Sequence, residues 1–294
     1  MKPARFEYFP ARSVEEACDL LGRYGGEASV LAGGQSLGPL LNLRLATPRA
    51  LVDINGVREL GFIRADDEAI EVGALTRQRS LECDPVVARA CPLVAEALPF
   101  IGHATIRNRG TVGGSLAHAD PAAELPAVVT ALEAELEIVG AGGTRTCSPH
   151  ELFVMPLTTT LAHDELLVGL RLPAVGPRTG HAWLELARRH GDFALVGVAC
   201  VLALDARGFA TAARLVYAGV GPTPYDARAA AGLLEGVEPG PEVFAAAAEV
   251  ASRECDPHSD LHASAEYRRR LVRVLTARAL ARAVERARGG VHSA

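Results

Sequence analysis

Lysine is almost absent from this chain of 294 residues: Lys2 is the only one, and all other basic residues apart from histidines are arginines. A Walker P-loop needs a lysine beside its glycines, and a pyridoxal phosphate enzyme needs one for its Schiff base. The shortage of lysine therefore excludes both classes of protein.

Closely spaced cysteines are missing as well. The six cysteines are scattered along the chain, and none belongs to a C-x-x-C pair. Zinc sites and iron–sulfur clusters depend on such pairs, so we expect buried free thiols instead. His258 and His262 have a spacing that can bind a metal on a helix, but no glutamate lies between them as in H-E-x-x-H. We expect an ordinary polar surface there and no metal site.

Long apolar runs and basic blocks are also lacking. No run of eighteen apolar residues occurs, and the first residues, "MKPARFEYFPARS", have no apolar core of a signal peptide. A soluble, cytoplasmic protein without a membrane span is therefore expected. The net charge is −5 and the isoelectric point is about 6.0, and basic residues concentrate only near the C-terminus. A nucleic-acid partner is not expected.

The order of segments predicts an α+β protein of two domains, residues 1–177 and 178–288. The first domain divides into subdomains of about 1–56 and 57–177. In the first subdomain we expect a helix over residues 14–24, begun by a capping box at Ser13 and Glu16. A strand at "ASVLA", a helix at "PLLNLRL" and a strand at "ALVDI" complete this subdomain.

The second subdomain changes to alternating patterns. The pattern predicts a hairpin over residues 61–75, a helix over 85–98 and a long loop over 101–126. A second hairpin and a closing strand at "ELLVGLRLP" follow. Three strands joined by short turns and then three helices predict that the second domain is a small three-stranded antiparallel sheet covered by helices.

The stretch "AGGQSLGPL" has two competing interpretations. Gly34, Ser36 and Gly38 spell G-x-S-x-G, the turn that presents a nucleophilic serine in α/β-hydrolases. Only one short strand precedes it, whereas a nucleophile elbow follows a central strand, so the hydrolase fits poorly. A glycine pair at the end of a strand also brings backbone amides close to a phosphate.

A second glycine pair, Gly113 and Gly114, lies in "TVGGSLAHA". Neither stretch matches the G-x-G-x-x-G fingerprint of a Rossmann fold. Two separate loops could instead close on one pyrophosphate, donating amides and the hydroxyls of Ser36, Thr111 and Ser115 without any cationic side chain. Two unrelated tight turns remain the alternative.

The two stretches "AGGQSLGPLLNLRLATPRALVDI" and "IRNRGTVGGSLAHADPAAELP", in this order, resemble the FAD-binding medium subunit of the molybdenum hydroxylases. This family includes bacterial carbon monoxide dehydrogenase and xanthine dehydrogenase. The resemblance extends from Phe6 to about Arg286. It implies that the first domain is the two-part FAD-binding fold of the vanillyl-alcohol-oxidase type. It also implies that "RRHGDFALVGVACVLALD" begins the C-terminal domain of the same family.

The resemblance implies a set of cofactor-binding residues and no acid, base or nucleophile in this chain. Asp120 and Glu124 would accept bonds from cofactor hydroxyls, and Glu124 stands where relatives carry aspartate. Phe193 would face the isoalloxazine where relatives often carry tyrosine, and Leu166 or Leu167 would touch the ring. The full set is Ala32, Gly33, Gly34, Gln35, Ser36, Leu37, Thr111, Val112, Gly113, Gly114, Ser115, Ala117, Asp120, Glu124, Leu166, Leu167 and Phe193.

The function implied is electron transfer through FAD. A large partner subunit would carry the molybdenum cofactor, a small subunit would carry two two-iron-two-sulfur clusters, and the whole would form a dimer of heterotrimers. FAD would pass electrons to an external acceptor such as NAD or a quinone. The alternatives are a stand-alone flavin oxidase of the vanillyl-alcohol-oxidase type and a non-catalytic scaffold that has lost its flavin.

Overall fold

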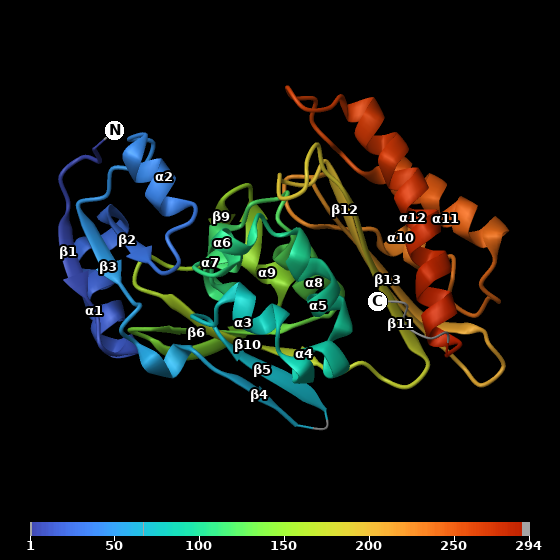
Figure 1. Ribbon diagram of the computed structural model, residues 1–294, viewed down its shortest axis with the longest axis horizontal. Helices are drawn as coiled ribbons and strands as arrows, with labels where there is room; N and C mark the ends of the chain where they lie inside the picture. The colour runs from blue at the N-terminus through green and yellow to red at the C-terminus, as the bar shows by residue number, and fades with distance from the viewer. Residues whose placement is uncertain (1, 67, 290–294) are drawn as a thin grey trace.

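The computed structural model describes residues 2–66 and 68–289 and has a mixed α/β architecture (Figure 1). The N-terminal part is a three-stranded parallel sheet of order β1-β3-β2. The predicted helix over residues 14–24 and the β-α-β arrangement after it are present, whereas strand β1 was missed. The elements are β1 (Glu7–Pro10), α1 (Val14–Tyr24), β2 (Ala28–Leu31), α2 (Leu37–Asn42) and β3 (Ala50–Asp53).

Helix α1 begins where its first amides find a side-chain acceptor. Ser13 Oγ accepts a hydrogen bond from the amide of Glu16 at 3.2 Å, as expected for an N-cap. The Glu16 carboxylate accepts from the amide of Arg12 at 2.8 Å, not from that of Ser13, so the predicted capping box is only half formed. The apolar face of α1 is buried against β3 and against Leu166 and Val168 of the next sheet.

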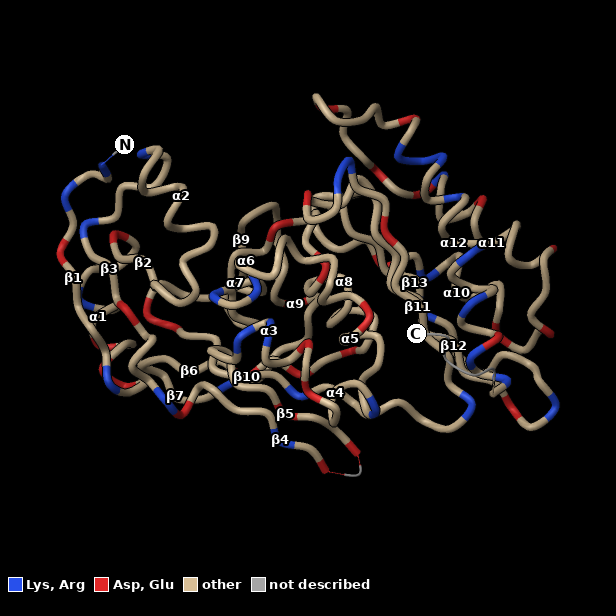
Figure 2. The backbone as a smooth tube through the Cα atoms, in the orientation of Figure 1, with Lys and Arg blue, Asp and Glu red and all other residues tan. Residues whose placement is uncertain are grey.

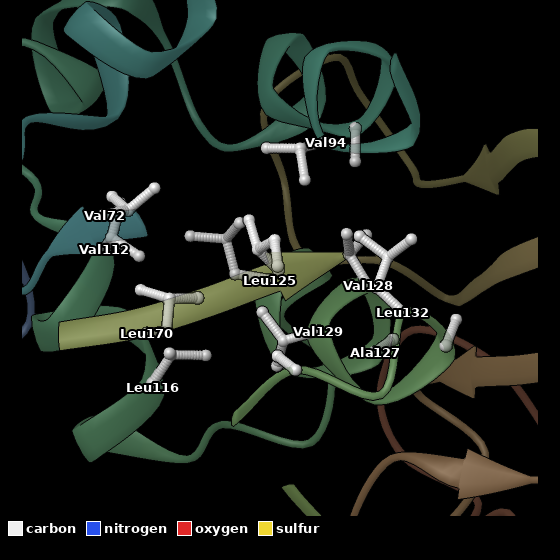
Figure 3. Close-up of a cluster of buried hydrophobic side chains, with 14 of the residues drawn as sticks. Val72, Val94, Val112, Leu116, Leu125, Ala127, Val128, Val129, Leu132 and Leu170 are labelled. Carbon is white, nitrogen blue, oxygen red and sulfur yellow. The ribbon is translucent and has the colours of Figure 1, made fainter. Parts of the chain in front are cut away.

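The middle of the chain forms a five-stranded antiparallel sheet of order β4-β5-β10-β6-β7, with short helices packed above it. Both predicted hairpins are present. Figure 3 shows Val112 and Leu116 of α7 beside Val72 of β5 and Leu170 of β10, in the core between helices and sheet. The strands are β4 (Ile63–Ala65), β5 (Ala69–Gly73), β6 (Glu135–Gly140), β7 (Gly143–Cys147), β8 (Phe153–Met155), β9 (Thr158–Thr159) and β10 (Leu166–Pro173).

Two predictions for the middle region were wrong. The expected helix over residues 85–98 is interrupted at Cys91, because Pro92 follows and restricts the residue before it to a non-helical conformation. The expected loop over 101–126 contains α6, α7 and the start of α8, which were too short to show a periodic pattern. The helices of the whole middle region are α3 (Gln78–Glu82), α4 (Pro85–Ala90), α5 (Pro92–Ala97), α6 (Ala104–Arg107), α7 (Val112–His118), α8 (Glu124–Ala131) and α9 (Pro149–Leu152).

The C-terminal sheet has four strands where three were predicted, because the two-residue strand β14 pairs with β13. Its order is β11-β12-β13-β14. Side chains alternate along β12: Val198 and Cys200 join the core under the C-terminal helices, whereas Ala199 joins the core of the middle region. The elements are β11 (Thr179–Leu186), β12 (Val196–Leu204), β13 (Ala210–Ala218), β14 (Tyr225–Asp226), α10 (Arg228–Gly232), α11 (Pro241–Glu254) and α12 (Ala265–Ala287).

The two regions are joined through both packing and charge. Helices α5 and α8 pack on one face of the C-terminal sheet, and α12 packs on the other. Glu96 of α5 forms ion pairs with Arg282 and Arg286 of α12 and accepts from the amide of Trp183. The predicted domain boundary at residues 177 and 178 falls in the segment between β10 and β11.

Positive and negative residues are interspersed along much of the chain, whereas α2 and α7 carry none (Figure 2). Five of the six cysteines are buried free thiols, as expected, and Cys83 is exposed. His258 and His262 lie exposed between α11 and α12 rather than on a helix. Over residues 2–66 and 68–289, no helix is long and apolar enough to cross a membrane.

Candidate cofactor site

The two glycine stretches meet in space although about eighty residues separate them in sequence. A methyl group placed on Gly33 would lie 2.4 Å from the carbonyl oxygen of Arg109 and 2.9 Å from Cα of Gly110. This is closer than any side chain tolerates, so glycine is required at position 33. Arg109 and Gly110 lead directly into Thr111 and α7. The first stretch therefore contacts the residues that directly precede the second stretch.

The first stretch, between β2 and α2, has unpaired backbone amides. The amides of residues 33–37 donate to no acceptor within the described parts of the chain. Gly34 has a φ of +71°, which turns the backbone after the strand, and the side chain of Gln35 donates to the carbonyl of Gly33 at 2.9 Å. A run of unpaired amides at a tight turn is suited to bind an anion.

Ser36 does not have the setting of a catalytic nucleophile. It is exposed, directly precedes the six-residue helix α2, and makes no side-chain capping bond. Among the described residues, no hydrogen bond connects Ser36 to a histidine that could act as its base. The hydrolase interpretation therefore has no structural basis.

The second stretch differs from the expected loop because it forms the first turn of α7. The amide of Val112 donates to the carbonyl of Thr76 at 3.0 Å, and that of Gly113 donates to the carbonyl of Ala74 at 2.8 Å. Thr111 Oγ1 accepts from the amide of Gly114 at 3.1 Å. The first amides of α7 are thus already engaged within the protein. This stretch can offer hydroxyls and the positive end of a helix rather than free amides.

Side chains that sequence reasoning missed hold the two stretches together. Asn55 Nδ2 donates to the carbonyl of Ala32 at 2.9 Å, and Asn55 Oδ1 accepts from Arg77 Nη2 at 2.7 Å. Arg77 Nη1 donates to the carbonyl of Arg109 at 2.6 Å. A cationic side chain, Arg77, therefore joins the two stretches, while binding of the pyrophosphate by amides and hydroxyls alone stays a prediction. No local motif marks Asn55 or Arg77, since their partners lie 22 to 32 residues away.

The two acidic candidates lie just beyond α7 in different environments. Asp120 is half-buried, and its Oδ1 accepts from the amide of Ala122 at 2.9 Å, which fixes the turn before α8. Glu124 is only 4% exposed. Burial raises the pKa of Glu124 to about 7, and the negative charge of Asp120 acts in the same direction. Glu124 therefore ionises at a higher pH than an ordinary glutamate.

The apolar candidates are divided between the interior and the surface. Leu166 and Leu167 are buried in two different cores, because neighbours on β10 point to opposite faces of the sheet. Phe193 is 59% exposed on the segment between β11 and β12. That segment touches the middle region, because Gly191 lies against the ring of His103. An exposed phenylalanine at such a junction has its ring available for a ligand.

The residues present fit a dinucleotide diphosphate. The cradle at Gly33 would be filled by any Cβ, the amides after it lack partners within the described chain, and hydroxyls of Ser36 and Ser115 lie on the two stretches. Arg77 and Arg109 add positive charge at the junction. Amide, hydroxyl and guanidinium groups donate hydrogen bonds that phosphate oxygens can accept. Residues 2–66 and 68–289 hold no group of side chains suited to a metal.

Matches to family models cover both halves of the chain. Residues 4–175 match the model of the FAD binding domain in molybdopterin dehydrogenase. Residues 181–283 match the model of the CO dehydrogenase flavoprotein C-terminal domain. These two matches define the class as a protein with an FAD-binding domain followed by a flavoprotein C-terminal domain.

Relatives and solved structures narrow this class. The chain is 42% identical over 288 residues to 6-hydroxypseudooxynicotine dehydrogenase complex subunit alpha of Paenarthrobacter nicotinovorans, covering 98% of this chain and 97% of that one. It is similar to a structure of carbon monoxide dehydrogenase from Hydrogenophaga pseudoflava, with a TM-score of 0.95, 39% identity, and coverage of 97% and 99%. For quinoline 2-oxidoreductase from Pseudomonas putida 86, the TM-score is 0.92 at 36% identity, with coverage of 98% and 99%. The chain belongs to the family of FAD-binding subunits of molybdenum hydroxylases.

Proposed function

We propose that the chain holds FAD between its two glycine stretches and passes electrons from a partner's iron–sulfur clusters to an external acceptor. The observation that carries this proposal is the contact between Gly33 and Arg109, beside amides of residues 33–37 that have no partner within the described chain. FAD, when bound, supplies the redox chemistry, because its flavin accepts and releases electrons. The protein contributes binding, orientation and electrostatics.

The first stretch supplies most of the diphosphate binding. The amides from Gly33 to Leu37, directly after Ala32, donate no hydrogen bond to other groups of the described chain. They can therefore donate to phosphate oxygens without breaking an existing hydrogen bond. A hydrogen bond to a charged group contributes about 1.5 to 3 kcal/mol. Gln35 keeps this turn in shape through its bond to Gly33. Ser36 adds a hydroxyl.

The second stretch supplies hydroxyls and a surface. Thr111 Oγ1 accepts from Gly114, so its own proton is free to be donated. Ser115 is half-buried and Ala117 is exposed on α7, and both belong to the proposed contact surface. Val112 and Gly113 act from beneath, because they are buried and fix α7 against the residues before α3.

The carboxyls and apolar side chains orient the rest of the cofactor. Asp120, which is half-buried, accepts bonds from ribose or ribityl hydroxyls. Glu124, with its pKa raised to about 7 by burial, can donate as well as accept near neutral pH. Phe193 lies against the isoalloxazine and excludes water from it. Leu166 or Leu167, which lie on opposite faces of β10, supplies an aliphatic contact to the ring.

The names of the relatives describe each of them as one chain of an enzyme with several subunits. The medium chain of carbon monoxide dehydrogenase from Hydrogenophaga pseudoflava and caffeine dehydrogenase subunit beta from a Pseudomonas species are each 37% identical to this chain. We therefore assign this chain to a complex with an iron–sulfur small subunit of two two-iron-two-sulfur clusters and a molybdenum-cofactor large subunit, as a dimer of heterotrimers. The external acceptor is NAD, a quinone or a similar compound. The first domain has the two-part fold of the vanillyl-alcohol-oxidase type.

The test is to purify the full chain, remove any flavin and titrate it with FAD and, separately, with riboflavin. We expect quenching of FAD fluorescence at one site per chain and much weaker binding of riboflavin, which lacks the diphosphate. Addition of the small and large subunits should then make reduction of the bound flavin depend on substrate. Failure to bind FAD would refute the proposal. Rapid oxidation of a small substrate by the isolated chain would favour a stand-alone oxidase.

A further inference from the structure

The contacts between the two glycine stretches form a closed ring. Asn55 joins the carbonyl of Ala32 to Arg77, and Arg77 joins Asn55 to the carbonyl of Arg109. The ring closes because Gly33, the residue after Ala32, rests on the same Arg109 carbonyl. The backbone of the first stretch is therefore attached to the entrance of α7 by both a direct contact and a side-chain bridge.

The amide of Asn55 is needed for both of its roles. Its Nδ2 donates to the carbonyl of Ala32 and also to Asp53 Oδ1 at 2.6 Å, while its Oδ1 accepts from Arg77. Aspartate would keep an acceptor for Arg77 but would lose the donor to Ala32 and would face Asp53 with a like charge. Asparagine, unlike aspartate, satisfies all three of these partners.

The guanidinium of Arg77 suits the other half of the bridge. It presents several N–H donors in a fixed plane, so two separate acceptors can be bound at once. Its two acceptors, Asn55 Oδ1 and the Arg109 carbonyl, come from the first subdomain and from the segment before α7. The partly buried guanidinium thus fixes a distance between two segments that have no covalent connection nearby.

We propose that Asn55 and Arg77 are positioning residues, which set the separation between the first glycine stretch and α7 and thereby hold the diphosphate cradle in its binding geometry. The inference rests on the proposed function, because it assigns the bridge a role in cofactor binding. Neither side chain needs to touch the cofactor. A cradle held at the right width loses less conformational freedom on binding and therefore binds more tightly.

The test uses flavin-free full chains titrated with FAD. Asn55→Ala and Arg77→Met should each raise the dissociation constant roughly tenfold, equivalent to about 1.4 kcal/mol. Because both residues act through one bridge, the double variant should lose about as much as either single variant rather than a hundredfold. Asn55→Asp should weaken binding like Asn55→Ala, because the bond to Ala32 is lost. Riboflavin affinity should change little in any variant.

Arg89→Met is the matched control, since Arg89 is an exposed arginine on α4. It should leave the affinity for FAD within twofold. Where a truncation unfolds the chain, Asn55→Asp and Arg77→Lys carry the test, with Tm of the flavin-free chain measured in parallel. Absence of FAD binding by the unchanged chain would refute the proposed function. Normal FAD affinity in the variants, with only Tm lowered, or fully additive losses in the double variant, would refute the positioning role.

Discussion

The two glycine pairs look alike in the sequence but differ in whether the backbone amides around them are hydrogen-bonded. Gly33 and Gly34 lie in a loop whose following amides have no partner within the described chain, whereas the amides of Gly113 and Gly114 are bonded to Ala74 and Thr111. The first pair leaves donors available for a ligand. The second pair allows a helix to sit close to the segment before α3.

The difference follows from what surrounds each pair. The backbone turns at Gly34, whose φ is +71°, and the amides of residues 33–37 have no partner within the described chain. Gly113 lies in the core interface, where a methyl group would approach Cβ of Ala74 to 2.5 Å. At both pairs a glycine is required because another segment of the backbone approaches closely, but only the first pair is followed by amides that have no partner within the described chain.

The largest effect is expected from Gly33→Ala. Its new methyl group would meet the Arg109 carbonyl at 2.4 Å, so the two stretches must separate. We expect a loss of about 3 kcal/mol of unfolding free energy and at least a hundredfold weaker FAD binding. Denaturant unfolding and FAD titration measure the two effects. Gly38→Ala is the control, because a Cβ there meets nothing within 4 Å and alanine favours the helix; normal FAD binding by Gly33→Ala would contradict the assignment.

Gly113→Ala should separate stability from binding. Overlap with Ala74 should cost about 3 kcal/mol of unfolding free energy. FAD affinity of the molecules that remain folded should fall much less than in Gly33→Ala, because the amide of Gly113 already donates to Ala74. Titration at low temperature, where the variant is folded, makes the comparison. Equal losses of FAD affinity in the two variants would show that the second pair also binds the ligand directly.

Sequence patterns predicted the elements that are long or strongly alternating. The helix over residues 14–24, both hairpins of the middle sheet and the three long C-terminal strands were found. Strand β14 and helix α6 were missed, because two to four residues cannot show a period. The candidate stretches were recognised from their glycines and hydroxyls. Asn55 and Arg77 were not, because their roles depend on which backbone carbonyls the fold brings within reach.

Glu124→Gln tests the buried carboxyl beyond the second stretch. The folded pKa of about 7 lies above the unfolded value near 4.5, so the stability that this carboxyl contributes is fully present below the unfolded pKa and is lost as the pH rises through 7. Glutamine cannot ionise. The variant should therefore become more stable relative to the unchanged chain by about 2 kcal/mol between pH 5 and pH 8. Urea unfolding of flavin-free protein across this range gives the difference, and a difference independent of pH would contradict the buried, raised pKa.

The smallest effect is expected from Ser36→Ala, and it returns to the contrast between the two stretches. Ser36 is exposed and makes no capping bond, so its removal should change the unfolding free energy by less than about 0.5 kcal/mol. FAD affinity should fall only a few-fold, because the amides of residues 33–37 remain. A hydrolase nucleophile would behave differently, since its removal would abolish ester hydrolysis without affecting flavin affinity.

Thr111→Ala is the companion variant, because it removes the hydroxyl that caps α7 and should cost about 1 kcal/mol of stability. If Ser36→Ala instead cost more stability than Thr111→Ala, the first stretch would be held by its side chain, and the description of it as a loop of free backbone donors would fail.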